Sequence, residues 1–295
     1  MNHSNRQTDS IRLVQYFAWI SLAFTALSVI LRILCLFLFF DSDIGYDRSD
    51  ALLPVLSYVW IAIGMFFLAG TALLRFHKNK LIRPVLDSNT LPLRITAGIA
   101  AVGLFALAVS DIVKNGNIWM GLMGLGACLY FLMQVSGTAT LGLRVLTGLF
   151  VIARLLAMLA STYLDIMVPM NAPDKVLLLL ACAAAMLFLI CEIRVSVSGV
   201  RPALYSFSLS AAILLTGTAS LPSIIASLTD SLSGSTPTIY YYVLLTFCIY
   251  AIARLLALPF HSHERPNEEE SVENPLPEST ETENVSNNTN DENSN

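Results

Sequence analysis

The sequence predicts an all-α integral membrane protein, a polytopic bundle of eight transmembrane helices. Only 13% of its 295 residues are charged and 55% are hydrophobic, whereas about 25% of the residues in a soluble protein are charged. The mean hydropathy of +0.66 agrees with this composition. Long apolar stretches follow one another along the chain with short polar connections between them, so a lipid bilayer is the expected surrounding.

Eight stretches are long enough to cross a membrane, because a helix needs about 20 apolar residues to span a hydrocarbon core of about 30 Å. The first is far longer than the apolar core of a signal peptide, which has about 7 to 15 residues, so we expect it to be retained. The fourth and sixth are the shortest. The predicted spans are residues 13–40, 52–74, 93–113, 118–135, 141–164, 176–193, 203–228 and 239–258.

The distribution of Lys and Arg predicts the topology. With a cytoplasmic N-terminus (residues 1–12), eleven Lys and Arg residues lie on or just inside cytoplasmic segments, and only Arg48, Lys114 and Lys175 lie outside. This bias satisfies the positive-inside rule. An even number of helices returns the chain to the cytoplasm, so we expect a multi-pass protein of the cell membrane with both ends cytoplasmic.

The C-terminal segment, residues 259–295, has a different composition from the rest. It holds 10 of the 21 acidic residues and one basic residue, Arg265, so the preceding chain carries a net charge of +5. With little apolar surface to bury, this segment is predicted to be a disordered acidic cytoplasmic tail. A cytoplasmic partner of the tail is one interpretation, and a solvated tail without a specific partner is the other.

Part of the first span recurs in the fifth. Residues 25–34 and 147–156 align without gaps and are identical at six of ten positions, including Arg32 with Arg154. We therefore predict two tandem four-helix repeats, residues 13–135 and 141–258, in parallel orientation, because each repeat has an even number of helices. A chance match between Leu-rich helices is the alternative, and it explains the matched arginines less well.

Arg32 and Arg154 are candidate functional residues because a charge inside a membrane helix costs about 2.5 to 3.5 kcal/mol on insertion scales. Side chains tilt toward the helix N-terminus, here away from the nearer surface, so snorkelling to the interface is disfavoured. We expect both arginines to face the interior, with Asp111 as the first choice of partner. A structural arginine network and a ligand site both remain open. Arg254 and Glu192, by contrast, are predicted to be interfacial.

The seventh span is rich in Ser and Thr and contains Pro222. Proline frees a backbone carbonyl and bends membrane helices, which suits a helix that lines a cavity. On this interpretation Ser220 joins Arg32, Arg154 and Asp111 in a ligand site between the two repeats. Close packing by small residues is the alternative interpretation of the same pattern.

The sequence gives no sign of catalysis. All four histidines lie outside the predicted spans, and there is no HExxH motif or phosphate-binding loop. The five cysteines lie singly in apolar stretches, without the paired spacing of a zinc site. We expect no catalytic residue, no cofactor, no metal site and no nucleic-acid partner.

Two functions fit these observations. The first is a small transporter or permease for an anionic or amphiphilic ligand, either a small molecule or a lipid, because internal repeats are common among transporters. The second is a non-transporting membrane scaffold or regulator, in which the arginines hold helices together and the acidic tail contacts a cytoplasmic protein.

The predicted topology can be tested by cysteine labelling in a background that lacks the native cysteines. A cysteine at position 47 should react with a membrane-impermeant reagent in intact cells, and a cysteine at position 80 should react only after the cells are opened, because the charge bias places them on opposite sides. Labelling at 80 but not at 47 in intact cells would contradict the topology.

Overall fold

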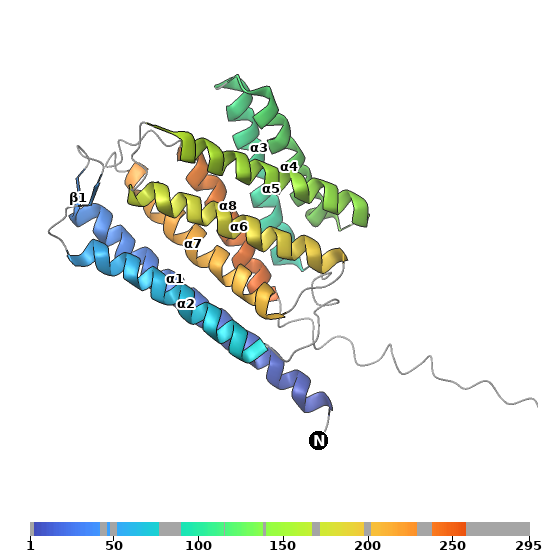
Figure 1. Ribbon diagram of the computed structural model, residues 1–295. Helices are drawn as coiled ribbons and strands as arrows, with labels where there is room; N and C mark the ends of the chain where they lie inside the picture. The colour runs from blue at the N-terminus through green and yellow to red at the C-terminus, as the bar shows by residue number, and fades with distance from the viewer. Residues whose placement is uncertain are drawn as a thin grey trace, which may run out of the picture. The chain divides into compact units, whose positions relative to one another are not determined.

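A computed structural model describes residues 3–41, 46–47, 52–76, 90–114, 116–137, 140–166, 172–197, 202–228 and 238–257. Within these residues the chain is all-α apart from one short two-stranded antiparallel sheet. Eight of its helices are long and apolar enough to cross a membrane (Figure 1). The elements are α1 (His3–Leu38), β1 (Phe40–Asp41), β2 (Tyr46–Asp47), α2 (Leu52–Phe76), α3 (Leu91–Val113), α4 (Ile118–Ser136), α5 (Leu141–Leu164), α6 (Pro173–Val197), α7 (Pro202–Leu228) and α8 (Thr238–Ala257).

Six of the eight helices end within two residues of the predicted spans, and α1 and α6 differ. α1 begins at His3, so the helix covers most of the expected N-terminal segment, and its candidate span begins only at Trp19. α6 begins three residues early, at Pro173. Proline is well suited to the first position of a helix, and the carboxylate of Asp174 in the first turn interacts favourably with the helix dipole. This early start places Asp174 on a helix instead of in a loop.

α7 is the central helix, and it packs against α1, α2, α6 and α8. In the most apolar segment of α7, 89% of the residues are buried, whereas 28% are buried in the most apolar segment of α2. The helices from α3 to α8 pack in chain order, and α8 returns to contact α3, which closes a ring. The hairpin of α1 and α2 packs on this ring through α7. We call the end of the bundle where β1 and β2 lie, and where α1 finishes and α2 begins, the hairpin end.

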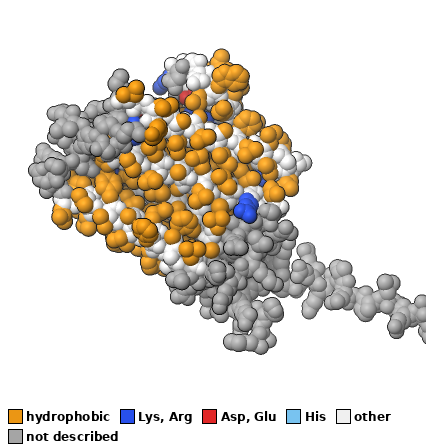
Figure 2. All heavy atoms as spheres, viewed as in Figure 1, with side chains coloured by type: hydrophobic (Ala, Val, Ile, Leu, Met, Phe, Trp, Pro, Cys, Tyr) orange, Lys and Arg blue, Asp and Glu red, His pale blue; other side chains and the backbone are white. Residues whose placement is uncertain are grey.

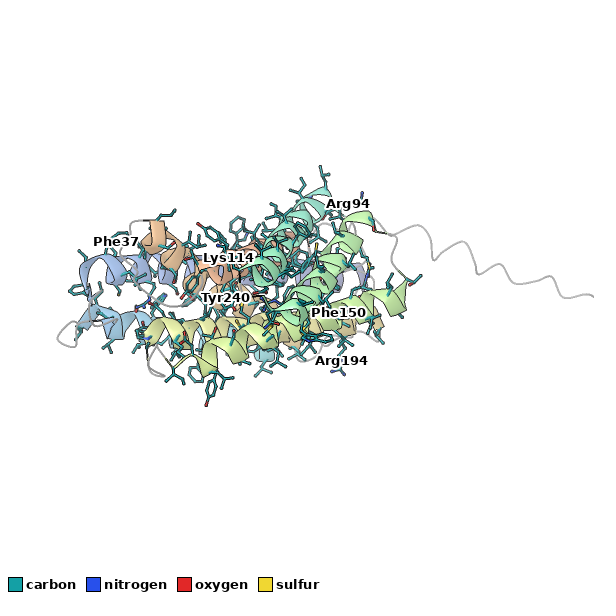
Figure 3. All side chains as sticks on the ribbon, turned by 90° about the horizontal axis from the view of Figure 1, so that it is seen from above. Phe37, Arg94, Lys114, Phe150, Arg194 and Tyr240 are labelled. Carbon is teal, nitrogen blue, oxygen red and sulfur yellow. The ribbon has the colours of Figure 1, made fainter. Side chains whose placement is uncertain are left out.

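The outer face of the bundle is apolar, as a lipid-embedded protein requires. Large side chains such as Phe66, Val102, Trp119 and Leu143 are exposed on four different helices. Figure 2 shows one face that is largely covered by hydrophobic side chains, with few Lys or Arg groups. The exposed side chain of Arg194 points away from the bundle (Figure 3). In water such a surface would drive aggregation, so its natural surrounding is the hydrocarbon of a bilayer.

Small residues allow α3 and α4 to pack closely. A Cβ atom added to Gly124 would lie 2.7 Å from the Cβ and 3.2 Å from the Cα of Ala108. An added Cβ at Gly121, one turn earlier, would collide with Ile112. Glycine therefore sets the separation of these two helices, as small residues do in other membrane bundles.

The four-helix duplication stays a prediction. α1 packs on α7, but the corresponding pair at the predicted offset, α5 and α3, makes no comparable contact in the described part of the chain. Several of the sequence predictions fall outside the described residues altogether. These are the acidic tail and the cytoplasmic segment around position 80.

The close contact of α3 and α4 predicts unequal effects for two similar substitutions. Gly124→Ala should lower the melting temperature in detergent, since overpacking costs about 1 to 3 kcal/mol. Gly98→Ala is the matched control, because a Cβ there meets its nearest neighbour, Val135, at 4.0 Å. An unchanged melting temperature for Gly124→Ala would show that the two helices lie farther apart than described.

Candidate functional site

Arg32 of α1 forms a partly buried ion pair with Asp174 of α6. Its Nη2 donates a hydrogen bond of 2.6 Å to Oδ1 of Asp174, and the guanidinium lies over the ring of Tyr58 with its Cζ 5.1 Å from the ring centroid. The Arg32 side chain is 1% exposed and that of Asp174 is 17% exposed. The expectation that Asp111 pairs with Arg32 is therefore wrong. Asp174 was assigned to a loop because the apolar run of the sixth span starts only after it.

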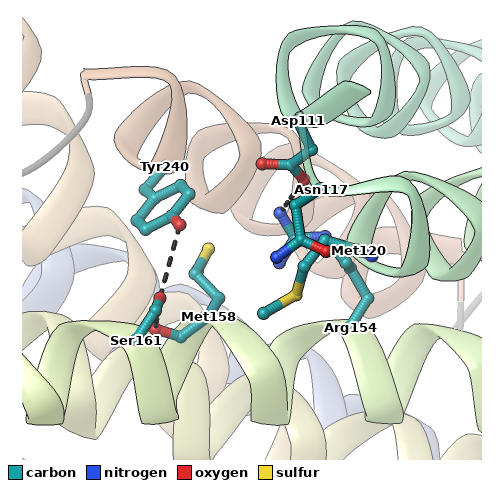
Figure 4. A network of polar contacts seen from close by, with 7 residues as sticks. All are labelled: Asp111, Asn117, Met120, Arg154, Met158, Ser161 and Tyr240. Atoms are coloured by element: carbon teal, nitrogen blue, oxygen red, sulfur yellow. Dashed lines mark hydrogen bonds and ion pairs between the residues drawn. The ribbon is translucent and has the colours of Figure 1, made fainter. Parts of the chain in front are cut away.

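Arg154 of α5 faces the interior and pairs with Asp111 of α3, as predicted. Its Nη2 donates to Oδ2 of Asp111 at 2.5 Å, and both side chains are buried. Figure 4 shows the guanidinium between α5 and the end of α3, with Met120 of α4 and Asn117, the residue that caps α4, beside it. Its Nε and Nη1 have no hydrogen-bond partner among the described residues.

A third pair joins α6 to α8. Arg254 donates from Nε and Nη2 to Oε1 of Glu192 at 2.8 and 2.7 Å, and the hydroxyl of Tyr250 donates to the same oxygen at 2.6 Å. Arg254 is 4% exposed and Glu192 is 2% exposed, so the prediction that these two residues are interfacial anchors is wrong. Both residues lie near the end of a predicted span. That position in the sequence does not indicate that the two side chains face each other across the bundle.

Six hydroxyl groups of α7 donate to its own backbone, whereas those of Tyr205 and Ser210 have no hydrogen-bond partner among the described residues. Ser220 is fully buried and donates to the carbonyl oxygen of Thr216 at 2.6 Å, and Thr216, Thr218 and Ser223 donate in the same way to carbonyls four residues earlier. These bonds satisfy the donors without an external ligand. They favour the interpretation of α7 as a closely packed helix.

The four candidate residues are not gathered around one point. Arg32 and Arg154 bind different carboxylates, on α6 and α3, and Ser220 bonds within α7. Arg32 and Arg154 thus belong to two separate ion pairs, whereas the sequence predicted one shared site. What they have in common is burial of a cation with a carboxylate from another helix.

A groove of about 440 Å³ lies between α2 and α6, with Leu215 of α7 among its lining residues. Each of the two helices contributes a single face, because the lining positions follow the i, i+3, i+4, i+7 spacing on both. The lining residues are Tyr58, Ile61, Ala62 and Met65 of α2 and Pro173, Val176, Leu177 and Leu180 of α6. The groove could not be predicted from the sequence, because apolar residues that line a groove and apolar residues that face lipid give the same sequence pattern.

The groove meets the ion pair of Arg32 at the hairpin end. Tyr58 lines the groove and stacks with the Arg32 guanidinium, and Pro173 lines it immediately before Asp174. From there the lining covers eight residues of each helix, which is about 10 Å at a rise of about 1.5 Å per residue. The groove is thus apolar along its length and polar at one end.

No protein family, no curated protein and no solved structure matches this chain. Its class therefore rests on the helices themselves. It is a multi-pass membrane protein with eight candidate spans, for which a bilayer is the surrounding medium.

The pair of Arg154 and Asp111 predicts a recoverable loss of stability. Arg154→Leu should lower the melting temperature in detergent, because breaking a buried ion pair costs about 3 to 5 kcal/mol when one charge is left alone. The double variant Arg154→Leu with Asp111→Leu should recover much of the loss. Arg94→Leu, at an exposed position of α3, is the control. A single variant as stable as this control would show that the pair does not hold α5 to α3.

Proposed function

We propose that this protein binds an amphiphilic membrane ligand in the groove between α2 and α6, as a small permease-like protein would. The observation that carries the proposal is an apolar groove that ends beside a partly buried ion pair. An amphiphile has the same arrangement, with an apolar chain and a polar head.

The walls of the groove suit a hydrocarbon chain. They are formed almost entirely by apolar side chains, and the volume lies within the range of about 300 to 1,000 Å³ that is typical of ligand sites. Val176 and Leu180 on one rim are 40% and 47% exposed, so the groove is open at its side. A ligand could enter laterally from the bilayer without crossing a polar barrier.

The polar end suits a head group. Asp174 stands at the start of α6, beside the groove residue Pro173, and Tyr58 connects the groove to the Arg32 guanidinium. With the proposed orientation, in which both chain ends are cytoplasmic, this hairpin end faces the outside. A lipid of the outer leaflet would then enter with its head toward Asp174 and its chain toward the membrane centre.

The proposal uses one of the predicted site residues directly. Arg32 holds Asp174 and Tyr58 in place at the head end. Ligand contacts by Arg154, Asp111 and Ser220 stay predictions, and the groove does not depend on them. We also keep the two-repeat duplication as a proposal, supported by the burial of both aligned arginines and by their pairing with a carboxylate.

A non-transporting scaffold is the second candidate function, and the three ion pairs favour it. Each of them joins two helices that are distant in sequence: α1 with α6, α3 with α5, and α6 with α8. A protein that only holds a shape in the membrane needs such links and needs no ligand. The two candidates differ in whether blocking the groove removes a binding activity.

Ala62→Trp places a large ring in the groove, because Ala62 is part of its lining. Lipid that remains bound through detergent purification should fall at least fivefold by mass spectrometry of the purified protein, while the melting temperature changes little, because the ring occupies an open space. Ala106→Trp, at an exposed position of α3, is the matched control. Equal lipid in both variants would contradict binding in the groove and favour the scaffold.

A further inference from the structure

The charges at the head end of the groove are unequally accessible. The Arg32 guanidinium is enclosed by Asp174 and the ring of Tyr58, with 1% of its side chain exposed. The side chain of Asp174 is 17% exposed. Its Oδ1 accepts the bond from Arg32, and no further hydrogen bond to this carboxylate is found among the described residues. The accessible part of the ion pair is therefore the anion.

The neighbouring charges follow the same pattern. Lys175 is 3% exposed, and its Nζ donates to the backbone carbonyl oxygen of Asp165 at 2.7 Å. The side chain of Asp165 itself is half-buried. Both cations at the start of α6 are thus covered, whereas both acidic side chains keep some contact with the surroundings.

We infer that the groove selects an amphiphile whose head carries a primary ammonium group, such as an ethanolamine phospholipid, and that Asp174 is the residue that selects it. An ammonium group near Asp174 can donate a hydrogen bond to Oδ2, and such charge-assisted bonds are about twice as strong as neutral ones. An anionic head would meet the accessible carboxylate instead and would be repelled.

The choice of a primary ammonium follows from the same geometry. The Tyr58 ring, which could hold a quaternary ammonium by a cation–π contact, already stacks with the Arg32 guanidinium. The remaining interaction is hydrogen bonding to the carboxylate, which a quaternary ammonium cannot provide because it has no N–H group. Choline lipids should therefore bind more weakly than ethanolamine lipids.

This inference rests on the proposed binding of an amphiphile in the groove, and one experiment separates the two. Native mass spectrometry of the full chain in detergent would measure the binding of phosphatidylethanolamine, phosphatidylcholine and phosphatidylglycerol, all with palmitoyl and oleoyl chains. We expect the ethanolamine lipid to bind about tenfold more tightly than the glycerol lipid, with the choline lipid weaker than the ethanolamine lipid. Ala62→Trp should weaken all three lipids together.

Substitutions of the carboxylate test the role of Asp174. Asp174→Asn should remove the preference for the ethanolamine lipid, and Asp174→Glu should retain it. Asp165→Asn, at the C-terminal end of α5, is the acidic control. Because Asp174→Asn removes the carboxylate that binds Arg32, the double variant Arg32→Gln with Asp174→Asn provides a second measurement in a chain where both members of this ion pair are neutral. It too should bind the three lipids alike.

The outcomes are distinct. If Ala62→Trp weakens binding but the glycerol or choline lipid binds as tightly as the ethanolamine lipid, the head-group inference is wrong and the groove proposal stands. A preference that survives in both variants lacking the Asp174 carboxylate also overturns the inference. If Ala62→Trp leaves the binding of every lipid unchanged, the proposed function itself fails.

Discussion

The ion pair between Arg32 and Asp174 determines how the first two helices sit on the other six. α1 and α2 pack on the ring of six helices mainly through α7, and Arg32 adds a charged link from α1 to the start of α6. A guanidinium in hydrocarbon without a counter-charge costs several kcal/mol, so α1 must stay within reach of α6 at this point. Farther along, α2 and α6 both rest on α7 and the groove remains between them. The spacing that defines the groove therefore depends on this pair.

The same requirement explains the rest of the polar interior. Arg154 with Asp111 and Arg254 with Glu192 each pair a buried cation with one carboxylate from another helix. The hydroxyl groups of Thr216, Ser220 and other residues on α7 bond to their own backbone, which lets the most enclosed helix be polar in composition and still pack closely. Polar residues inside this bundle thus hold helices in place, and the partly exposed carboxylate of Asp174 lies beside the groove.

Much of the fold could be predicted from the sequence, because the length and apolar composition of a span are local properties. α5 has the predicted bounds, and the inward direction of Arg154 followed from the tilt of side chains toward the helix N-terminus. Pairing across the bundle could not be predicted in the same way. Asp174 precedes the apolar run of α6, so the hydropathy pattern does not place it on a helix. Arg254 lies near the end of a span, a position that predicts an interfacial anchor. Which helices become neighbours is decided by packing between distant segments, and the groove depends on that packing.

The most direct test of this account is an experimentally determined map of the protein in lipid nanodiscs that contain an ethanolamine phospholipid. The account predicts elongated density between α2 and α6, over Leu215, with its head end beside Asp174 and with Arg32 still bonded to that carboxylate. Direct contact of α2 with α6 that closes the groove, or an Arg32 side chain that reaches the membrane surface away from Asp174, would contradict it.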